Sequence, residues 1–149
     1  MKTAICYCSC HHGNPLKVLE AMTHEGKIDL IDVTAGHASH LERYDCIGFA
    51  SGVYYGKFHD SVLSFARQYL PEGKNVFFVC TYGGGKGSST GQLEALAAKR
   101  RCNVLGTFSC KGHDIFGPFK LVGGIAKGRP NEKDLANARN FYRDILARS

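Results

Sequence analysis

The 149-residue sequence predicts a doubly wound α/β fold, with a five-stranded parallel sheet covered by helices on both faces. Two observations predict it. Short runs of strand-forming residues alternate with helical segments five times along the chain. The third of these runs, residues 46–50, is apolar throughout and the fourth, residues 76–80, is the most hydrophobic, which is typical of strands buried on both faces. We expect strand order 2-1-3-4-5 and one domain over residues 1–149.

The first half of the chain contains three predicted strands and two helices. The first helix has Asn14 as its N-cap, Pro15 at its first position and Gly26 as its end. Pro71 stops the second helix. The predicted order is strand 3–9, a helix between Asn14 and Gly26, strand 28–33, a polar irregular stretch 34–44, strand 46–50, a loop 51–58 and a helix from His59 to Tyr69.

The second half continues the alternation and ends in an amphipathic helix capped by Asn131. The apolar side chains of this helix share one face; they are Leu135, Ala138, Phe141, Tyr142 and Ile145. The other predicted elements are strand 76–80, a glycine-rich loop 82–91, a helix from Gln92 to Arg101, strand 104–108 and a long connection 110–130.

Charge and composition exclude several classes of protein. Nineteen Lys and Arg against thirteen Asp and Glu give a net charge of +6. The basic residues are scattered, so we expect no nucleic-acid site. No apolar run is long enough for a membrane helix and no export signal precedes the first strand, so we expect a cytoplasmic protein without stable membrane insertion. We expect the seven cysteines to stay reduced and mostly to pack as small apolar residues.

A first candidate site lies between the first strand and its helix, in the segment from Ser9 to Pro15. Backbone N–H groups at a helix start attract anions. Side chains of this segment can add hydrogen bonds to a phosphate, although a merely well-capped helix would have the same pattern. The candidate phosphate-binding residues are Ser9, His11, His12, Gly13, Asn14 and Pro15.

Two further candidate loops follow the third and fourth strands, and both contain tyrosines among glycines. Aromatic rings at the edge of a sheet can stack on a flat ligand, and glycine lets the backbone approach it. These residues are Ser51, Gly52, Val53, Tyr54, Tyr55 and Gly56, and then Thr81, Tyr82, Gly83, Gly84 and Gly85. All three loops follow carboxyl ends of strands, where open α/β sheets bind ligands. Together they predict a site for a phosphorylated, planar aromatic ligand.

At these loops the sequence resembles the flavodoxin family, over essentially its whole length and in the short-chain form. Ser9, Gly13 and Asn14 match that family's Ser-x-Thr-Gly-Asn-Thr phosphate loop, whereas a histidine pair and Pro15 stand where threonines are usual. The resemblance implies non-covalent FMN, with Tyr54 and Tyr82 flanking the flavin. It also implies that the backbone around Tyr55 and Gly56 addresses the flavin N5.

The chain differs from typical flavodoxins in charge, since those are acidic and this chain is basic. Fewer negative charges near the flavin should favour its anionic, fully reduced form. Redox protein partners should accordingly present an acidic docking surface to Lys57, Lys86 and Lys111. We expect a monomer or weak dimer.

The resemblance implies an electron carrier between a reductase and a terminal redox enzyme, with no catalytic side chain. Two alternatives remain open. One is a flavodoxin-type FMN-dependent oxidoreductase, similar to protoporphyrinogen oxidases around Tyr55 to His59, or an NAD(P)H-dependent quinone or flavin reductase. The other is a non-redox binding module on the same scaffold.

A metal site is not expected in the segment Cys6-x-Cys8-x-Cys10-His11-His12, although it contains three cysteines and two histidines. Its spacing differs from that of zinc motifs, and Cys6 should be buried within the sheet. A thiol beside the flavin remains possible for Cys8, Cys10, Cys80 and Cys110.

Overall fold

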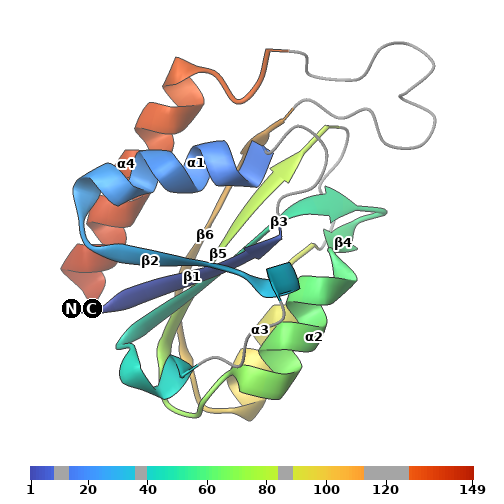
Figure 1. The fold of residues 1–149 in the computed structure, drawn as a ribbon, viewed down its shortest axis with the longest axis vertical. Coiled ribbons are helices and arrows are strands. Elements are labelled where there is room, and N and C mark those ends of the chain that lie inside the picture. The colour runs from blue at the N-terminus through green and yellow to red at the C-terminus, as the bar shows by residue number, and fades with distance from the viewer. Residues whose placement is uncertain (9–13, 36–39, 84–88, 113–127) are drawn as a thin grey trace.

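A computed structural model describes residues 1–8, 14–35, 40–83, 89–112 and 128–149. It is a three-layer α/β structure in which α1 and α4 cover one face of the sheet and α2 and α3 cover the other (Figure 1). The helices are α1 (Asn14–Met22), α2 (Asp60–Tyr69), α3 (Gly91–Lys99) and α4 (Glu132–Arg148). The strands are β1 (Thr3–Cys8), β2 (Ile28–Asp32), β3 (Cys46–Tyr54), β4 (Lys57–Phe58), β5 (Asn75–Tyr82) and β6 (Asn103–Lys111).

The sheet order is β2-β1-β3-β5-β6, and all neighbours on this path are parallel. This confirms the predicted order 2-1-3-4-5, because β4 is an extra two-residue strand that pairs only with β3. The polar stretch before β3 contains two short 3-10 turns, Val33–Ala35 and Leu41–Arg43. The parallel order sets the carboxyl ends of β1, β3 and β5 side by side.

The prediction of an irregular loop over residues 51–58 is wrong, because these residues form a β-hairpin. β3 continues to Tyr54, turns through Tyr55 and Gly56, and returns as β4. Both turn residues have positive φ angles, 51° and 80°, as a two-residue type I′ hairpin requires. β5 is likewise longer than predicted, so Thr81 and Tyr82 are strand residues.

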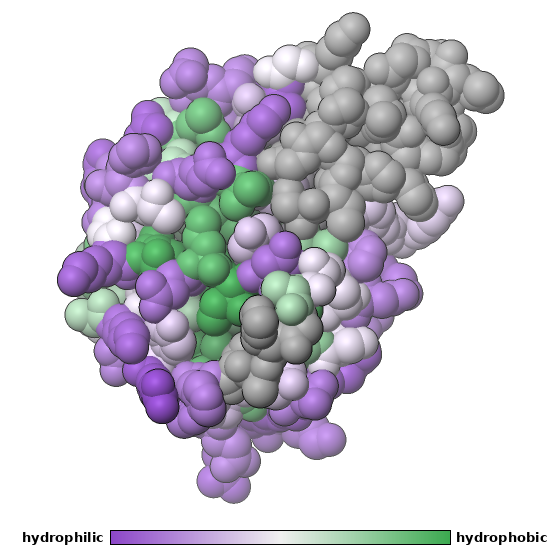
Figure 2. All heavy atoms as spheres, in the orientation of Figure 1, coloured by the Kyte–Doolittle hydropathy of each residue, from purple (hydrophilic) through white to green (hydrophobic). Residues whose placement is uncertain are grey.

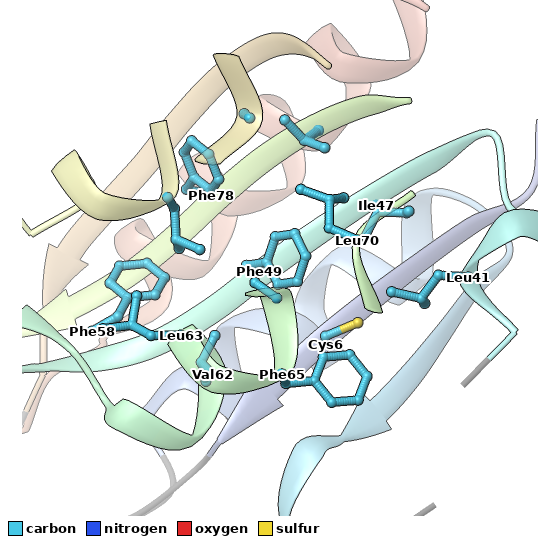
Figure 3. Packing of buried hydrophobic residues seen from close by; sticks show 14 of the residues in the cluster. Cys6, Leu41, Ile47, Phe49, Phe58, Val62, Leu63, Phe65, Leu70 and Phe78 are labelled. Atoms are coloured by element: carbon cyan, nitrogen blue, oxygen red, sulfur yellow. The ribbon is translucent and has the colours of Figure 1, made fainter. Parts of the chain in front are cut away.

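Phe58 holds the hairpin onto the core. Its side chain is fully buried in the layer between the sheet and α2, where Figure 3 shows it close to Leu63 and Val62 of α2 and on the same side of the sheet as Phe49. Burying a phenylalanine contributes roughly 2 kcal/mol, so this one side chain anchors the hairpin to the core.

The edge strand β2 is only partly covered. Figure 2 shows hydrophobic side chains gathered over β2 and α1 within a hydrophilic surround. Ile28, Leu30 and Ile31 of β2 are half-buried, whereas Asp29 and Asp32 are exposed. Charges on an edge strand oppose pairing with another sheet, and among the described strands β2 pairs only with β1.

The last helix packs as its apolar spacing predicts. Ala138, Tyr142 and Ile145 are buried against the sheet, and Leu135 and Phe141 pack beside them. Asn131 caps the helix by accepting a hydrogen bond from the Asp134 amide, as predicted.

The Tyr142 hydroxyl donates to Thr3 Oγ1 at 2.9 Å, in a buried position. Replacing Tyr142 by phenylalanine should lower the free energy of unfolding by about 1 kcal/mol, because Thr3 then loses its partner. Urea unfolding of Tyr142→Phe, Thr3→Val and the double variant measures the coupling. The double variant should cost less than the sum of the single ones; strict additivity would show that the hydrogen bond contributes nothing.

Candidate functional site

The carboxyl edge of the sheet brings the ends of three predicted site segments together. β1 ends at Cys8, which pairs with Ser51 of β3, and Ser51 pairs on its other side with Cys80 of β5. One residue further along, Gly52 pairs with Thr81. The tyrosine-bearing ends of β3 and β5 are therefore neighbours, and the strand that leads to α1 lies beside them (Figure 1).

Of the predicted phosphate-binding segment, Ser9 to Pro15, the structure describes only Asn14 and Pro15. α1 begins at Asn14 with Pro15 in its first turn, and Pro15 is buried. A short 3-10 turn, Thr23–Glu25, follows α1 and ends at Gly26 as expected. Ser9, His11, His12 and Gly13 lie outside the described residues, as do Gly84 and Gly85 of the third loop. Their role as ligand contacts stays a prediction.

The hairpin presents its two tyrosines differently. Tyr54 is half-buried, and its ring lies back over Gly52, where an added Cβ would come within 3.3 Å of the Tyr54 hydroxyl oxygen. Tyr55 is at the tip and is 82% exposed. An added Cβ at Gly56 would meet no atom within 4 Å. The hairpin thus combines an ordered ring near the strand with open backbone at its tip.

Ser51 and His59 tie the hairpin to α2. Ser51 Oγ is buried, accepts a hydrogen bond from the His59 backbone N–H at 3.0 Å and donates one to the Gly52 carbonyl at 2.6 Å. The His59 ring caps α2, because its Nδ1 accepts from the Ser61 amide at 3.1 Å. Histidine is not among the favoured N-cap residues, so the sequence offered no signal for this role.

On the other side of the edge, β5 ends at Tyr82, which is half-buried, and Gly83 follows. The Tyr82 carbonyl accepts a hydrogen bond from Gly112 at 2.9 Å, which holds the ends of β5 and β6 together. Thr81 is buried beside Gly52 of β3. The third predicted segment therefore begins on ordered strand residues.

An ion pair near Tyr82 was missed by sequence reasoning. Arg129 contacts the buried Asp134 carboxylate with two nitrogens, at 2.5 and 2.7 Å. The hydrogen bonds from Arg129 hold the pKa of Asp134 below its usual range, and Asp134 raises that of Arg129. Cys110 and Tyr82 add smaller contributions that raise the pKa of Arg129. Only the spacing of Asn131 and Asp134, which fits a capping box, indicated part of this arrangement.

The described cysteines behave as packing residues. Burial raises the pKa of the Cys6 thiol strongly. It also raises the pKa of Cys46 and of Cys110 to about 12, with smaller contributions from Asp45 and Asp134 respectively. A protonated, buried thiol is a poor metal ligand and a poor nucleophile. Among the described residues, no cluster of three potential metal ligands occurs.

A separate hollow lies at the opposite, amino-terminal edge of β1 and β2. It measures about 460 Å³, and its lining consists of Lys2, Thr3, Thr23, Gly26, Lys27, Ile28 and Asp29. It brings together no aromatic side chain and none of the predicted site residues. Position in the fold therefore favours the carboxyl edge as the functional site.

Comparisons with known proteins agree with this architecture. A family profile described as a flavodoxin domain matches residues 4–108. The chain belongs to the flavodoxin family. It is 35% identical over 148 residues to an uncharacterized protein of Methanocaldococcus jannaschii, covering 98% of this chain and 99% of that one.

Three solved structures share the fold at low sequence identity. A flavodoxin from the domain Archaea has a TM-score of 0.74 at 18% identity, covering 99% of this chain and 98% of the other. Oxidised flavodoxin 2 of Bacillus cereus has a TM-score of 0.75 at 14% identity, and the match covers 100% of both chains. FMN-bound flavodoxin of Fusobacterium nucleatum has a TM-score of 0.71 at 11% identity, and the match covers 99% of this chain and 98% of the other. In the part of the chain that the structure describes, no helix has the length and apolar character to cross a membrane.

Proposed function

We propose that this protein binds one FMN at the carboxyl edge of its sheet and carries electrons between redox proteins. The observation that carries the proposal is the position of Tyr54 and Tyr82 at the carboxyl ends of adjacent strands, beside the strand that leads into α1. Membership of the flavodoxin family and the FMN in the Fusobacterium nucleatum structure support it.

The described residues fit a flat, phosphorylated group. Tyr54 and Tyr82 are each half-buried, so their rings can cover a planar ligand while staying ordered. Gly56 leaves backbone uncovered by side chains, whereas the Tyr54 ring lies over Gly52. The start of α1 at Asn14 offers backbone N–H groups that have no partner within the helix, and such groups can bind an anion.

FMN would supply one- and two-electron chemistry, and the chain would bind and position it. The segment Ser9 to Pro15 would hold the phosphate. Tyr54 and Tyr82 would flank the ring, and the turn at Tyr55 and Gly56 would present backbone groups to it. No described side chain needs to transfer a proton in this scheme.

Binding can be tested with the apoprotein, FMN and riboflavin. FMN should bind and lose its fluorescence, and riboflavin should bind more weakly because it lacks the phosphate. Tyr82→Leu should weaken FMN binding by about tenfold, since one stacking partner is lost. Tyr69→Leu, at the far end of α2, is the matched control and should change the dissociation constant by less than about twofold. Equal affinities of the native protein for FMN and riboflavin would contradict the phosphate site.

The carrier role has its own test. Anaerobic reductive titration of the FMN complex should show reversible reduction, and the complex should not oxidise NAD(P)H on its own. Turnover of NAD(P)H with a quinone and no added reductase would instead support an enzyme.

An acidic docking partner is the finer part of this proposal. Lys57 on the hairpin and Lys111 at the end of β6 are exposed at the site edge. The exposed Asp60 lies 3.5 Å from Lys57 and offsets part of its charge, so Lys111 and the net charge of +6 matter more. Electron transfer to an acidic redox protein should slow as ionic strength rises.

A further inference from the structure

Tyr55, at the tip of the hairpin, is a large aromatic residue that the fold leaves in solvent. Its side chain is 82% exposed, and an added Cβ at the following residue, Gly56, would meet no atom within 4 Å. The fold buries little of the Tyr55 ring, so burial of this ring adds little to stability. A single exposed hydrophobic residue is ordinary on a protein surface, and exposure by itself indicates no function.

The backbone of the turn makes Tyr55 unusual. Its φ is 51°, in the left-handed region, where the Cβ of a bulky residue crowds the following carbonyl oxygen. At this position of a type I′ turn, asparagine, aspartate and glycine are the favoured residues. The chain therefore has a residue that weakens the turn and gains little packing in return. Backbone strain of this kind is a reason to look for a functional role.

The position of Tyr55 in the fold indicates what that role is. Among the described residues, the exposed large hydrophobic side chains are those of Met1, Tyr55 and Val104. Met1 precedes β1 and Val104 is the second residue of β6, so both lie at the amino edge of the sheet. Of these three, Tyr55 alone lies at the carboxyl edge, in the turn that directly follows β3. A redox partner must approach the flavin at this edge, because electron transfer slows steeply with distance.

The charges beside the turn favour an apolar contact at the tip. Lys57 lies 3.5 Å from Asp60, which offsets part of its charge. Tyrosine provides a large contact area with few rotatable bonds, and it is enriched among the residues that dominate binding at interfaces. The net charge of +6 acts over a longer range and attracts an acidic protein. Attraction between the two proteins and contact at the tip are therefore separate contributions.

We propose that the Tyr55 side chain anchors a redox partner on the hairpin, and that this partner is an acidic redox protein with an apolar depression beside its own redox centre. The inference rests on the proposed function, because that function places the flavin at this edge. In the complex the Tyr55 ring leaves water and fills the depression. One electron then passes from the reduced centre of the partner to the oxidised FMN, so the centre is oxidised and the FMN is reduced.

The first test asks whether the Tyr55 side chain serves the fold. Tyr55→Asn places the favoured Asn-Gly pair in the turn, so its urea midpoint should rise above that of the native protein. Tyr55→Phe keeps the ring and the same backbone crowding, so its midpoint should stay at the native value. A lower midpoint for Tyr55→Asn than for the native protein would overturn the inference, because the side chain would then be stabilising the hairpin itself.

The second test measures electron transfer with a reduced acidic ferredoxin as the probe, by anaerobic stopped flow. FMN is kept saturating, so that a change in flavin affinity does not enter the rates. Each rate is divided by the rate with dithionite, a small reductant that needs no docking surface. The ratio should fall about tenfold in Tyr55→Asn, the size of effect expected when an interface anchor is removed.

Two controls accompany this measurement. The ratio for Tyr55→Phe should stay within about twofold of the native one, because the ring supplies the contact. Val104→Asn removes an exposed hydrophobic side chain at the opposite edge and should follow the native protein. An unchanged ratio in Tyr55→Asn, or an equal fall in Val104→Asn, would overturn the inference.

Ionic strength separates the anchor from the long-range attraction. The rate with ferredoxin should fall as salt is added, whereas the factor between native protein and Tyr55→Asn should stay constant, because salt does not screen an apolar contact. A factor that vanishes at high salt would contradict an apolar anchor. A ferredoxin rate that rises with salt would contradict an acidic partner.

The two proposals fail in different ways. A native protein that binds no FMN would refute the proposed function and this inference with it. A native protein that binds FMN but shows the same rate ratio as Tyr55→Asn would refute the role of Tyr55 alone.

Discussion

Replacing Gly48 by alanine should lower the free energy of unfolding by about 2 to 3 kcal/mol, because the new methyl group overpacks the core. A Cβ at Gly48 would lie 2.6 Å from the tip of the Phe77 ring. That ring is fully buried and packs against Phe141 and Tyr142, with centroids 6.0 and 6.1 Å away, so it has little room to move aside.

Urea unfolding measures the effect, and Gly91→Ala is the matched control. A Cβ at Gly91, at the start of α3, would meet no atom within 4 Å. That change should leave stability unaltered or raise it by about 0.5 kcal/mol. Combining Gly48→Ala with Phe77→Leu should cost less than the sum of the two single changes, since the smaller side chain makes room. Equal stability of Gly48→Ala and Gly91→Ala would contradict the packing described for β3 and β5.

Replacing Asp134 by asparagine should lower the free energy of unfolding by about 2 kcal/mol at pH 7, because charge-assisted hydrogen bonds are lost. The pKa of Asp134 is lowered mainly by its hydrogen bonds from Arg129, and then by the Asn131 amide. Its ionised form therefore stabilises the fold above about pH 4, the usual range of a free aspartate, and this stabilisation is lost as pH falls through the lower folded value.

The difference between native protein and Asp134→Asn should accordingly be constant from pH 7 to pH 5 and shrink below about pH 4. Asp144→Asn, another aspartate of α4, serves as control. A difference that persists unchanged at the lowest pH at which both proteins fold would show that the carboxylate charge is not what stabilises this end of α4.

Most of the fold was predictable because strand and helix periodicities differ and both are strong here. The central strands are buried on both faces, so their apolar runs were unambiguous, and Asn131 and Pro15 marked helix starts. Each of these signals is local in sequence, and each corresponds to an element that the structure contains.

The hairpin was missed for a physical reason. Its turn places Tyr55, with φ of 51°, where asparagine or aspartate is usual, so the common Asn-Gly signal is absent. β4 has only two residues, and what holds it in place is the burial of Phe58 under α2, a tertiary contact. The sequence placed Tyr54 and Tyr82 after the third and fourth strands but could not show that both are strand residues.

The contacts around the site were harder to predict than its position. The edge follows from topology alone, whereas Ser51–His59 and Arg129–Asp134 depend on how segments meet after folding. Ser51 and His59 are eight residues apart and are joined only because the hairpin folds back. Neither pair has a sequence motif of its own, apart from the capping-box spacing at Asp134.

Mapping of amide shifts on adding FMN to the labelled apoprotein tests the location of the flavin site most directly. We predict that the largest changes fall on residues 52–57, on Tyr82 and Gly83, and at the start of α1. Changes centred instead on Lys2 and residues 26–29, around the hollow at the opposite edge, would contradict the assignment of the site, and so would the absence of any change.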